Sequence, residues 1–353
     1  MSVPTRRADQ LFRTVRPRKK TKATEYLASG NYPVIDQGRD LVAGFSDDEE
    51  AVLQGPAILF GDHTRILKYI KVPFVPGADG TQLLTAEDGT DIRYLFYALH
   101  TIPMDSKGYE RHFKYLKEGD IPVPDLPVQL RIADILSAYD DLIENNTRRI
   151  AILEDMARRL FEEWFDRPTL EVLPDGWAVQ PLRNFLKLHY GKALKADTRV
   201  EGLVPVYGSS GAVGSHNVAL VSGPGIILGR KGNVGSVFYS HCDFYPIDTV
   251  FYVETGLPLH FVYQLLRHQT FSNSDSAVPG LNRELALAKE VVLPPIDAII
   301  RYDAWVGPVV EQAQSLRSAN VTLRTTRDLL LPKLISGEIE VRAVEEELET
   351  AAA

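Results

Sequence analysis

The sequence has one cysteine, Cys242, among its 353 residues, which excludes an internal disulfide. It also lacks the paired Cys and His spacing of a structural zinc site, so we expect neither disulfide staples nor a metal. No apolar run is long enough to cross a bilayer, and the basic N-terminal stretch lacks the apolar core of a signal peptide. These absences predict a cytoplasmic protein with no membrane partner.

Several enzyme motifs are absent as well. The sequence has no Gly-rich phosphate loop of the Walker type, no Asn-Pro-Pro-aromatic methyltransferase signature and no Glu-x-Lys nuclease element. His63 stands next to Asp62, but without a nucleophile such a neighbour pair is typical of a hydrogen-bonded turn. We therefore predict a protein without catalytic residues and without a cofactor.

The remaining composition is that of an ordinary globular protein, with 44% hydrophobic and 24% charged residues. At this length two domains are expected. The net charge of −8 argues weakly against a nucleic-acid partner. Basic residues nevertheless cluster at positions 13–22, 107–117 and 187–199. A local basic face is therefore compatible with the sequence.

The same order of features occurs twice, about 170 positions apart. Gly55-Pro56-Ala57-Ile58-Leu59-Phe60-Gly61 is repeated as Gly223-Pro224-Gly225-Ile226-Ile227-Leu228-Gly229, and both segments read as strands bounded by turns. The aromatic helical stretch at 94–99 is answered by 261–266. The sequence thus predicts two similar globular units.

Each unit is followed by a long helix with a heptad pattern. Apolar positions alternate in steps of four and three from Ile132 to Trp164, and again from Tyr302 to Leu334. Pro308 is a position at which the second helix could break or restart. A seam of the first length spans on the order of 50 Å at 1.5 Å per residue, enough to act as a spacer.

These observations give a fold class and a domain plan. We expect an α+β protein with two β-rich mixed domains, whose long helices form an intramolecular antiparallel coiled coil with pseudo-two-fold symmetry. The predicted boundaries are a first domain at 1–125, its spacer helix at 126–167, a second domain at 168–295, its spacer helix at 296–337 and an acidic tail at 338–353.

One asparagine lies near the middle of each seam. Buried polar residues at such positions can fix the register of a coiled coil, so we predict that Asn146 and Asn320 face each other. The alternative is that both are partly solvated and unpaired. A further alternative is that the seams drive self-association instead of pairing within one chain, although two in-register seams in one chain argue against it.

Several segments carry a resemblance to a known protein family. The ends of the two long helices carry this resemblance, in Leu160-Phe161-Glu162-Glu163-Trp164-Phe165 and Leu330-Leu331-Pro332-Lys333-Leu334-Ile335-Ser336-Gly337. Similar segments are Leu173-Pro174-Asp175-Gly176-Trp177, before the second unit, and Phe60-Gly61-Asp62-His63-Thr64-Arg65, in the first. These segments resemble the specificity subunit of type I restriction-modification systems, and together they span nearly the whole chain.

The resemblance implies a non-catalytic subunit that reads a split sequence in double-stranded DNA. Methyltransferase (modification) subunits and a motor-nuclease (restriction) subunit would be its protein partners. Each globular unit would then read one half-site through base edges, while lysine and arginine on phosphates would set its position.

The expected DNA contacts lie in loops after the Gly-flanked strands, where polar and basic residues gather without helical or strand periodicity. In the first unit they are His63, Arg65, Lys68, Lys71, Lys107, Tyr109, Arg111 and Lys114. In the second they are Lys192, Lys195, Ser209, Ser210, Arg230, Lys231, Asn233, Asn282 and Arg283. We rank Arg230-Lys231-Gly232-Asn233 highest, because its flanking glycines permit close backbone approach.

Other interpretations remain open at this point. Lys68 and Lys71 could simply decorate the solvent side of a strand, and 107–117 could be a solvated loop. For the whole chain, the acidic balance also fits a duplicated scaffold that binds protein or carbohydrate through its two globular units.

Overall fold

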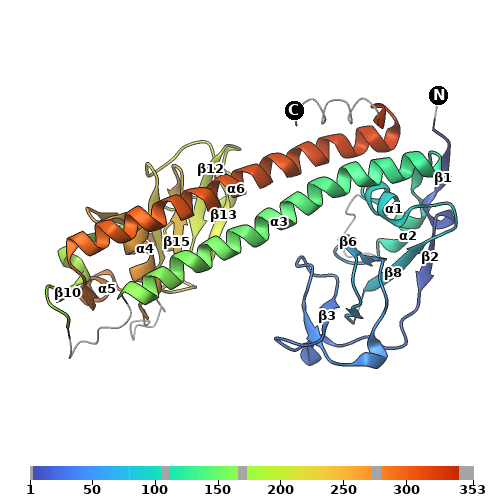
Figure 1. The fold of residues 1–353 in the computed structure, drawn as a ribbon. Coiled ribbons are helices and arrows are strands. Elements are labelled where there is room, and N and C mark those ends of the chain that lie inside the picture. Colours follow the sequence, from blue (N-terminus) through green and yellow to red (C-terminus); the bar gives the residue numbers. More distant parts are fainter. Residues whose placement is uncertain (1–2, 79, 105–110, 166–172, 272–279, 342–353) are drawn as a thin grey trace. The chain divides into compact units, whose positions relative to one another are not determined.

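The computed structural model describes residues 3–78, 80–104, 111–165, 173–271 and 280–341. The chain forms two compact units. The first unit consists of residues 1–145 and 320–353, and the second of residues 146–319. Figure 1 shows the elements of each, and each unit is described by itself below.

The first unit is built on an antiparallel four-stranded sheet of order β2-β8-β5-β6. A three-stranded sheet of order β4-β3-β7 and the pair β1-β9 complete its β structure. The strands are β1 (Thr5–Arg7), β2 (Phe12–Val15), β3 (Tyr32–Ile35), β4 (Gly44–Ser46), β5 (Ala57–Gly61), β6 (Leu67–Ile70), β7 (Val75–Pro76), β8 (Thr81–Ala86) and β9 (Asp120–Pro122). The two short helices are α1 (Ile92–Leu99) and α2 (Phe113–Glu118).

The second unit repeats this plan element by element. Its sheets have the orders β11-β17-β14-β15, β13-β12-β16 and β10-β18. The strands are β10 (Ala178–Pro181), β11 (Leu186–Tyr190), β12 (Val204–Gly208), β13 (Gly211–His216), β14 (Gly225–Gly229), β15 (Val237–Ser240), β16 (Tyr245–Pro246), β17 (Val250–Thr255) and β18 (Glu290–Leu293). The short helices are α4 (Leu259–Arg267) and α5 (Arg283–Ala288). The predicted duplication is confirmed.

Single 3-10 turns link these elements. They are η1 (Ala8–Gln10), η2 (Ala23–Glu25), η3 (Glu49–Ala51), η4 (Leu182–Asn184) and η5 (Ala196–Thr198).

Two long helices continue from the units, α3 (Leu126–Phe165) and α6 (Ile296–Ser336). Every position of the two predicted heptad seams is buried or half-buried, as a helix pair requires. Pro308 does not interrupt α6, contrary to the possibility raised by the sequence. It lies on the exposed side, where water can bind the carbonyl that loses its donor. Gly337 follows α6 in the left-handed conformation (φ 75°) that commonly ends helices.

In each unit the two helices run antiparallel. In the second unit, the Tyr302 hydroxyl donates to the Ala157 carbonyl, while Arg317, further along α6, binds Glu154, further back along α3. In the first, Asn320 donates to the Ile143 carbonyl and Arg327 binds Asp140.

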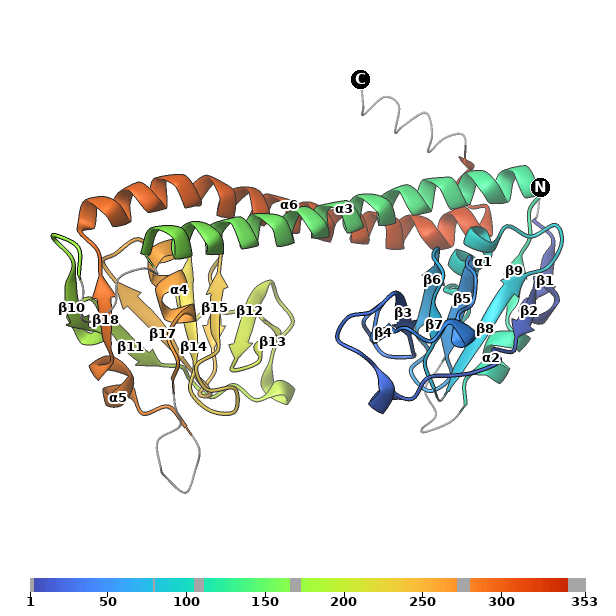
Figure 2. The same cartoon turned by 60° about the horizontal axis from the view of Figure 1, so that its bottom comes forward.

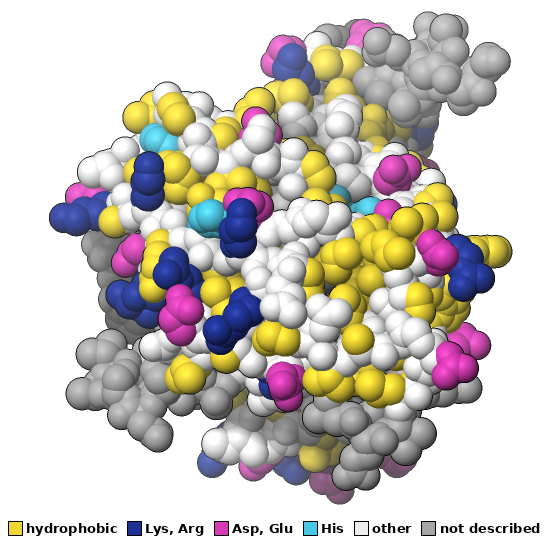
Figure 3. Space-filling model, turned by 90° about the vertical axis from the view of Figure 1, so that its left-hand side faces the viewer, with side chains coloured by type: hydrophobic (Ala, Val, Ile, Leu, Met, Phe, Trp, Pro, Cys, Tyr) yellow, Lys and Arg dark blue, Asp and Glu magenta, His cyan; other side chains and the backbone are white. Residues whose placement is uncertain are grey.

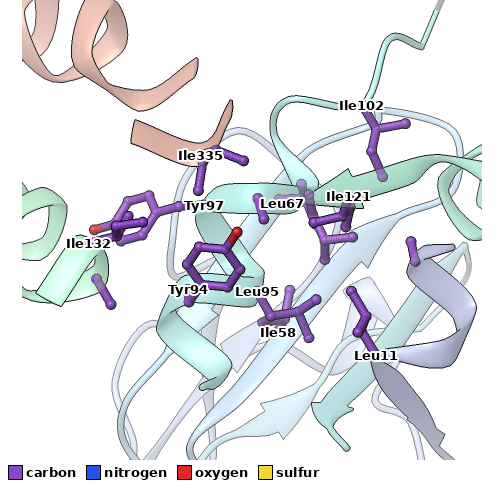
Figure 4. Packing of buried hydrophobic residues seen from close by; sticks show 14 of the residues in the cluster. Leu11, Ile58, Leu67, Tyr94, Leu95, Tyr97, Ile102, Ile121, Ile132 and Ile335 are labelled. Atoms are coloured by element: carbon purple, nitrogen blue, oxygen red, sulfur yellow. The ribbon is translucent and has the colours of Figure 1, made fainter. Parts of the chain in front are cut away.

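The helices also complete the cores of the units. In the first unit Ile132 from α3 and Ile335 from α6 join Tyr94, Leu95 and the residues of the sheet in one buried cluster (Figure 4). In the second, Phe161 and Tyr302 join the equivalent cluster. Asp91 caps α1 by accepting from the amides of Arg93 and Tyr94, which fixes where this helix begins over the sheet.

No helix among the described residues is long and apolar enough to cross a membrane.

Candidate nucleic-acid interface

The highest-ranked segment of the second unit forms a loop that the residue just before β17, Thr249, holds in place. The amides of Arg230 and Lys231 both donate to the Thr249 carbonyl, at 2.9 and 3.0 Å. The Arg230 carbonyl in turn accepts from the Leu281 amide at 2.8 Å. This contact ties the loop after β14 to the segment that precedes α5. Residues far apart in the sequence therefore meet at one edge of the sheet.

Two arginines of this edge lie over one tyrosine. The guanidinium of Arg230 is 5.1 Å from the Tyr190 ring centroid, and that of Arg283 is 5.4 Å from it. Arg230 also donates to the Asp248 carbonyl at 2.7 Å, which fixes its direction. Tyr190 is half exposed at the end of β11. The result is an exposed aromatic ring flanked by two oriented cations.

Glycines make this loop possible. A Cβ on Gly229 would lie 2.1 Å from the Asn233 carbonyl oxygen, and Gly232 and Gly235 have φ angles of 76° and 79°. Side chains are strained in both situations. The loop therefore depends on the glycine spacing that the sequence showed.

The other predicted residues of the second unit fall into three groups. Ser209 bonds to the same loop, since its hydroxyl accepts from the Asn233 amide at 3.4 Å and its carbonyl from the Ser236 hydroxyl at 2.7 Å. Asn282 caps α5, so its side-chain oxygen already accepts two backbone amides. The exposed residues are Lys192, Lys195, Ser210 and Asn233, and Lys231 is half-buried with its ammonium 3.9 Å from Asp248.

In the first unit the equivalent loop follows Gly61 and has a different chemistry. Asp62 stands where the second unit has Arg230, each directly after the last residue of the central strand. It is buried, and its carboxylate accepts from the Phe113 amide at 2.8 Å, so it ties the loop to α2. Arg65 has a φ of 62°, and its guanidinium donates to the Met104 carbonyl. His63 is half-buried in the same turn.

Lys68 is not a solvent-facing strand residue, contrary to one interpretation of the sequence. Its side chain is 4% exposed, and its ammonium donates to the Asp40 carbonyl beside Asp36. Burial lowers the pKa of Lys68, although the nearby carboxylates oppose this. A loop that folds over β6 covers this side of the strand, which strand periodicity cannot reveal.

Lys71 binds Asp141 of α3 at 2.6 Å and so lies at the helix side of the unit. Arg111 and Lys114 are exposed at the start of α2. Lys107 and Tyr109 lie outside the described residues.

Sequence reasoning missed two parts of this surface. Tyr190 was not selected, because an aromatic residue in a strand pattern is usually core. The other part is the basic segment after β2, which was not predicted from the sequence to contact DNA. In the first unit this segment corresponds to the segment that follows Tyr190 in the second unit. It carries the exposed residues Arg16, Arg18 and Lys20, and Lys20 donates to the Thr81 carbonyl at 2.9 Å. The strand-end position in both repeats was the available signal.

Asn320 is 3% exposed and donates to the Ile143 carbonyl at 3.3 Å, while Asn146 is 9% exposed. Their predicted pairing stays a prediction.

The surface of the second unit is mixed rather than uniformly basic. On the face in Figure 3, Lys and Arg side chains alternate with Asp and Glu, and hydrophobic side chains are exposed between them. Within the described part of the chain, no group of three or more His, Cys, Asp and Glu residues is placed to hold a metal ion. The oriented groups described above are suited to hydrogen bonding and stacking.

Comparison with known proteins agrees with this duplicated architecture. Residues 4–155 match the type I restriction modification DNA specificity domain. The type I restriction enzyme MjaIX specificity subunit of Methanocaldococcus jannaschii is 26% identical over 313 residues, which are 74% of this chain and 72% of the relative. Residues 4–155 therefore match the specificity-domain family, and 74% of the chain is similar to a type I specificity subunit.

Two further similar proteins have lower sequence identity. The EcoR124I/EcoR124II specificity subunit of Escherichia coli is 24% identical over 144 residues, 36% of either chain. The crystal structure of the S subunit of a type I restriction-modification system from M. genitalium superposes with a TM-score of 0.60 at 20% identity, covering 94% of this chain and 96% of that one. At this identity the structural match supports the fold.

Proposed function

We propose that this chain is a type I specificity subunit whose two units read the two halves of a bipartite double-stranded DNA site. In the second unit, Arg230, Arg283 and Tyr190 would face the bases, while Lys192, Lys195 and Lys231 would bind phosphates. In the first unit, His63, Arg111 and the segment at 16–20 would do the same. The subunit itself would catalyse no reaction.

The observation that carries this proposal is that the two units share one fold but differ in the loop after the central strand. Both units tie the loop after the central strand to the segment before the following short helix, through Asp62 and His112 in one and Arg230 and Leu281 in the other. Asp62 is buried and structural, whereas the Arg230 side chain reaches an exposed ring. Two loops with the same backbone contacts but different side chains are suited to reading two different half-sites.

The outer faces of the long helices are proposed to dock the methyltransferase subunits. Large apolar side chains are exposed there, including Trp305 (68% exposed), Ile300 and Ile152. Exposed apolar groups of this size on a helix are typical of protein interfaces. A motor-nuclease subunit would then join the assembled complex.

DNA binding tests the proposal directly. With methyltransferase subunits present, affinity for the cognate split site should exceed that for scrambled DNA by at least about 10³-fold and should fall steeply with salt. The cognate site is found first by sequencing methylated bases in cells with and without the gene. A bipartite motif that disappears with the gene supports the proposal, and equal affinity for every sequence contradicts it.

The scaffold alternative, which binds protein or carbohydrate, is not favoured by the family match. It predicts that the paired substitutions Arg230→Ala and Lys231→Ala leave DNA binding unchanged.

A further inference from the structure

The second unit contains a cavity of about 470 Å³ where its sheet meets the long helices. Its lining residues come from β12, from β15 and the residues after it, from α4, and from the parts of α3 and α6 that belong to this unit. Figure 2 shows where these elements lie in the second unit. Small-molecule sites in proteins usually have volumes of about 300 to 1,000 Å³. The cavity lies apart from the loop that carries Arg230, which is not among its lining residues.

Two polar atoms at this cavity have no hydrogen-bond partner among the described residues. Gln264 is 4% exposed, and its side-chain oxygen Oε1 is buried without a donor. Arg317 binds Glu154 through Nη2, whereas its Nη1 is buried without an acceptor. Buried polar groups are nearly always satisfied, so each unmet atom points to a missing partner. One requires a donor and the other an acceptor.

In the first unit, side chains of the protein itself satisfy the polar groups at the equivalent position. Tyr97 of α1 is equivalent to Gln264 of α4, because the stretches 94–99 and 261–266 correspond. The Tyr97 hydroxyl donates to Asp140 at 2.5 Å, and Asp140 also accepts from Arg327. In the matched heptad register, α6 places Val310 at the position of Asp140. The chain therefore supplies no side-chain partner for Gln264 from this position.

The other walls are aromatic. Tyr239 and Tyr263 line the cavity with ring centroids 5.6 Å apart, and the Arg267 guanidinium lies 5.5 Å from the Tyr263 ring. Flat rings favour a flat ligand, because stacking adds to the burial of apolar surface. His241 also lines the cavity, and burial lowers its pKa to about 4. At neutral pH its imidazole is uncharged and can donate or accept one hydrogen bond.

We propose that this cavity binds a small planar nitrogen heterocycle that carries an anionic group, a chemistry that a nucleoside monophosphate represents. An exocyclic N–H of the heterocycle, such as the amino group of adenine, donates to Gln264 Oε1, the ring stacks on one of the two tyrosines, and the anion accepts from Arg317 Nη1. Because both long helices and the sheet contribute walls, the bound molecule would also stiffen the second unit.

Isothermal titration calorimetry of the full chain with adenosine 5′-monophosphate tests this site. We expect saturable one-site binding with a Kd below about 1 mM. Adenosine and inorganic phosphate, titrated separately, should each bind at least about tenfold more weakly, because each supplies half of the recognition. Phosphate that binds as tightly as the nucleotide would mean an adventitious ion only, and adenosine that does so would remove the anion from the proposal. No saturable heat at about 10 mM nucleotide overturns it.

Two substitutions test whether the nucleotide binds in the cavity. Gln264→Leu and Arg317→Met should each weaken nucleotide binding at least about tenfold. Tyr97→Phe, in the equivalent place of the first unit, should leave it unchanged. Circular dichroism and the Tm, measured first, establish that each variant is folded. Equal nucleotide affinity in all three folded variants overturns the proposal. DNA affinity measured on the same preparations reports separately on the proposed recognition function.

Discussion

The guanidinium of Arg230 lies 5.1 Å from the ring centroid of Tyr190, and the guanidinium of Arg283 approaches the same ring. These residues come from three separate segments of the second unit, namely the end of β11, the loop after β14 and the start of α5. The Tyr190 ring therefore positions two guanidinium groups that come from separate segments of the chain. The first three predictions concern this surface.

Tyr190→Ala should weaken binding of cognate DNA by about tenfold, because a cation–π contact contributes about 0.5 to 2 kcal/mol and two are lost. Tyr190→Phe retains the ring and should bind nearly as well as the unchanged protein. Fluorescence anisotropy with a labelled cognate duplex, in the presence of methyltransferase subunits, measures both. Equal loss in the two variants would assign the effect to the hydroxyl instead of the ring face.

Lys231→Ala should weaken binding to cognate and scrambled DNA by similar factors. Its ammonium is 3.9 Å from Asp248 and remains available to a phosphate. Loss of one phosphate contact should lower the slope of log K against log salt by about 1. Lys187→Ala is the matched control, since Lys187 is exposed at the far end of β11 and binds Glu254. An unchanged salt slope for Lys231→Ala would exclude this lysine as a phosphate ligand.

Gly229→Ala should disrupt the loop after β14. The added methyl group would meet the Asn233 carbonyl oxygen at 2.1 Å, so the backbone must shift. We expect DNA affinity to fall at least about tenfold, the equivalent of about 1.4 kcal/mol. Gly256→Ala, where nothing lies within 4 Å, should keep full affinity. Hydrogen exchange at residues 229–236 should increase in the first variant alone.

Asn320→Asp should lower the free energy of unfolding by about 3 kcal/mol at pH 7, because it leaves a buried charge beside the Ile143 carbonyl. Asn320→Leu should be tolerated or slightly stabilising, since the seam is otherwise largely apolar. Asn145→Asp, at an exposed position of α3, is the control. Urea denaturation measures all three. A stability of Asn320→Asp equal to that of the control would show that water reaches the seam.

His241 should make the second unit less stable in acid. Burial lowers the pKa of His241 to about 4 from the ordinary value of 6.5. The unfolded chain therefore binds more protons than the folded one between these pH values, and stability falls as the pH is lowered through that window. His241→Phe should flatten this dependence in urea denaturation followed from pH 7 to pH 4. An unaltered profile would show that solvent already screens the imidazole.

The sequence was sufficient for the architecture because the fold relies on repeated, local patterns. Steps of four and three between Ile132 and Trp164 specify a helix seam regardless of context, and the two Gly-Pro strands mark equivalent places in two units. The matched sheet orders confirm the repeated strands, and α3 and α6 confirm the two long helices.

The candidate DNA-binding surface was less predictable, because it is formed by segments that lie far apart in the sequence. Lys68 appears exposed by strand periodicity, yet the backbone near Asp40 folds over it. Tyr190 belongs to the surface through Arg230 and Arg283, 40 and 93 positions away in sequence. Neither contact produces a periodic pattern in the sequence.

The core of the first unit includes Leu334 and Ile335, which lie near the end of α6. During synthesis most of this unit emerges before α6, so it lacks part of its interior until the end of α6 has left the ribosome. Its partly exposed apolar surface would be open to chaperones throughout that interval. Deletions at the C-terminal end of α6 should accordingly damage the half of the protein that was made first.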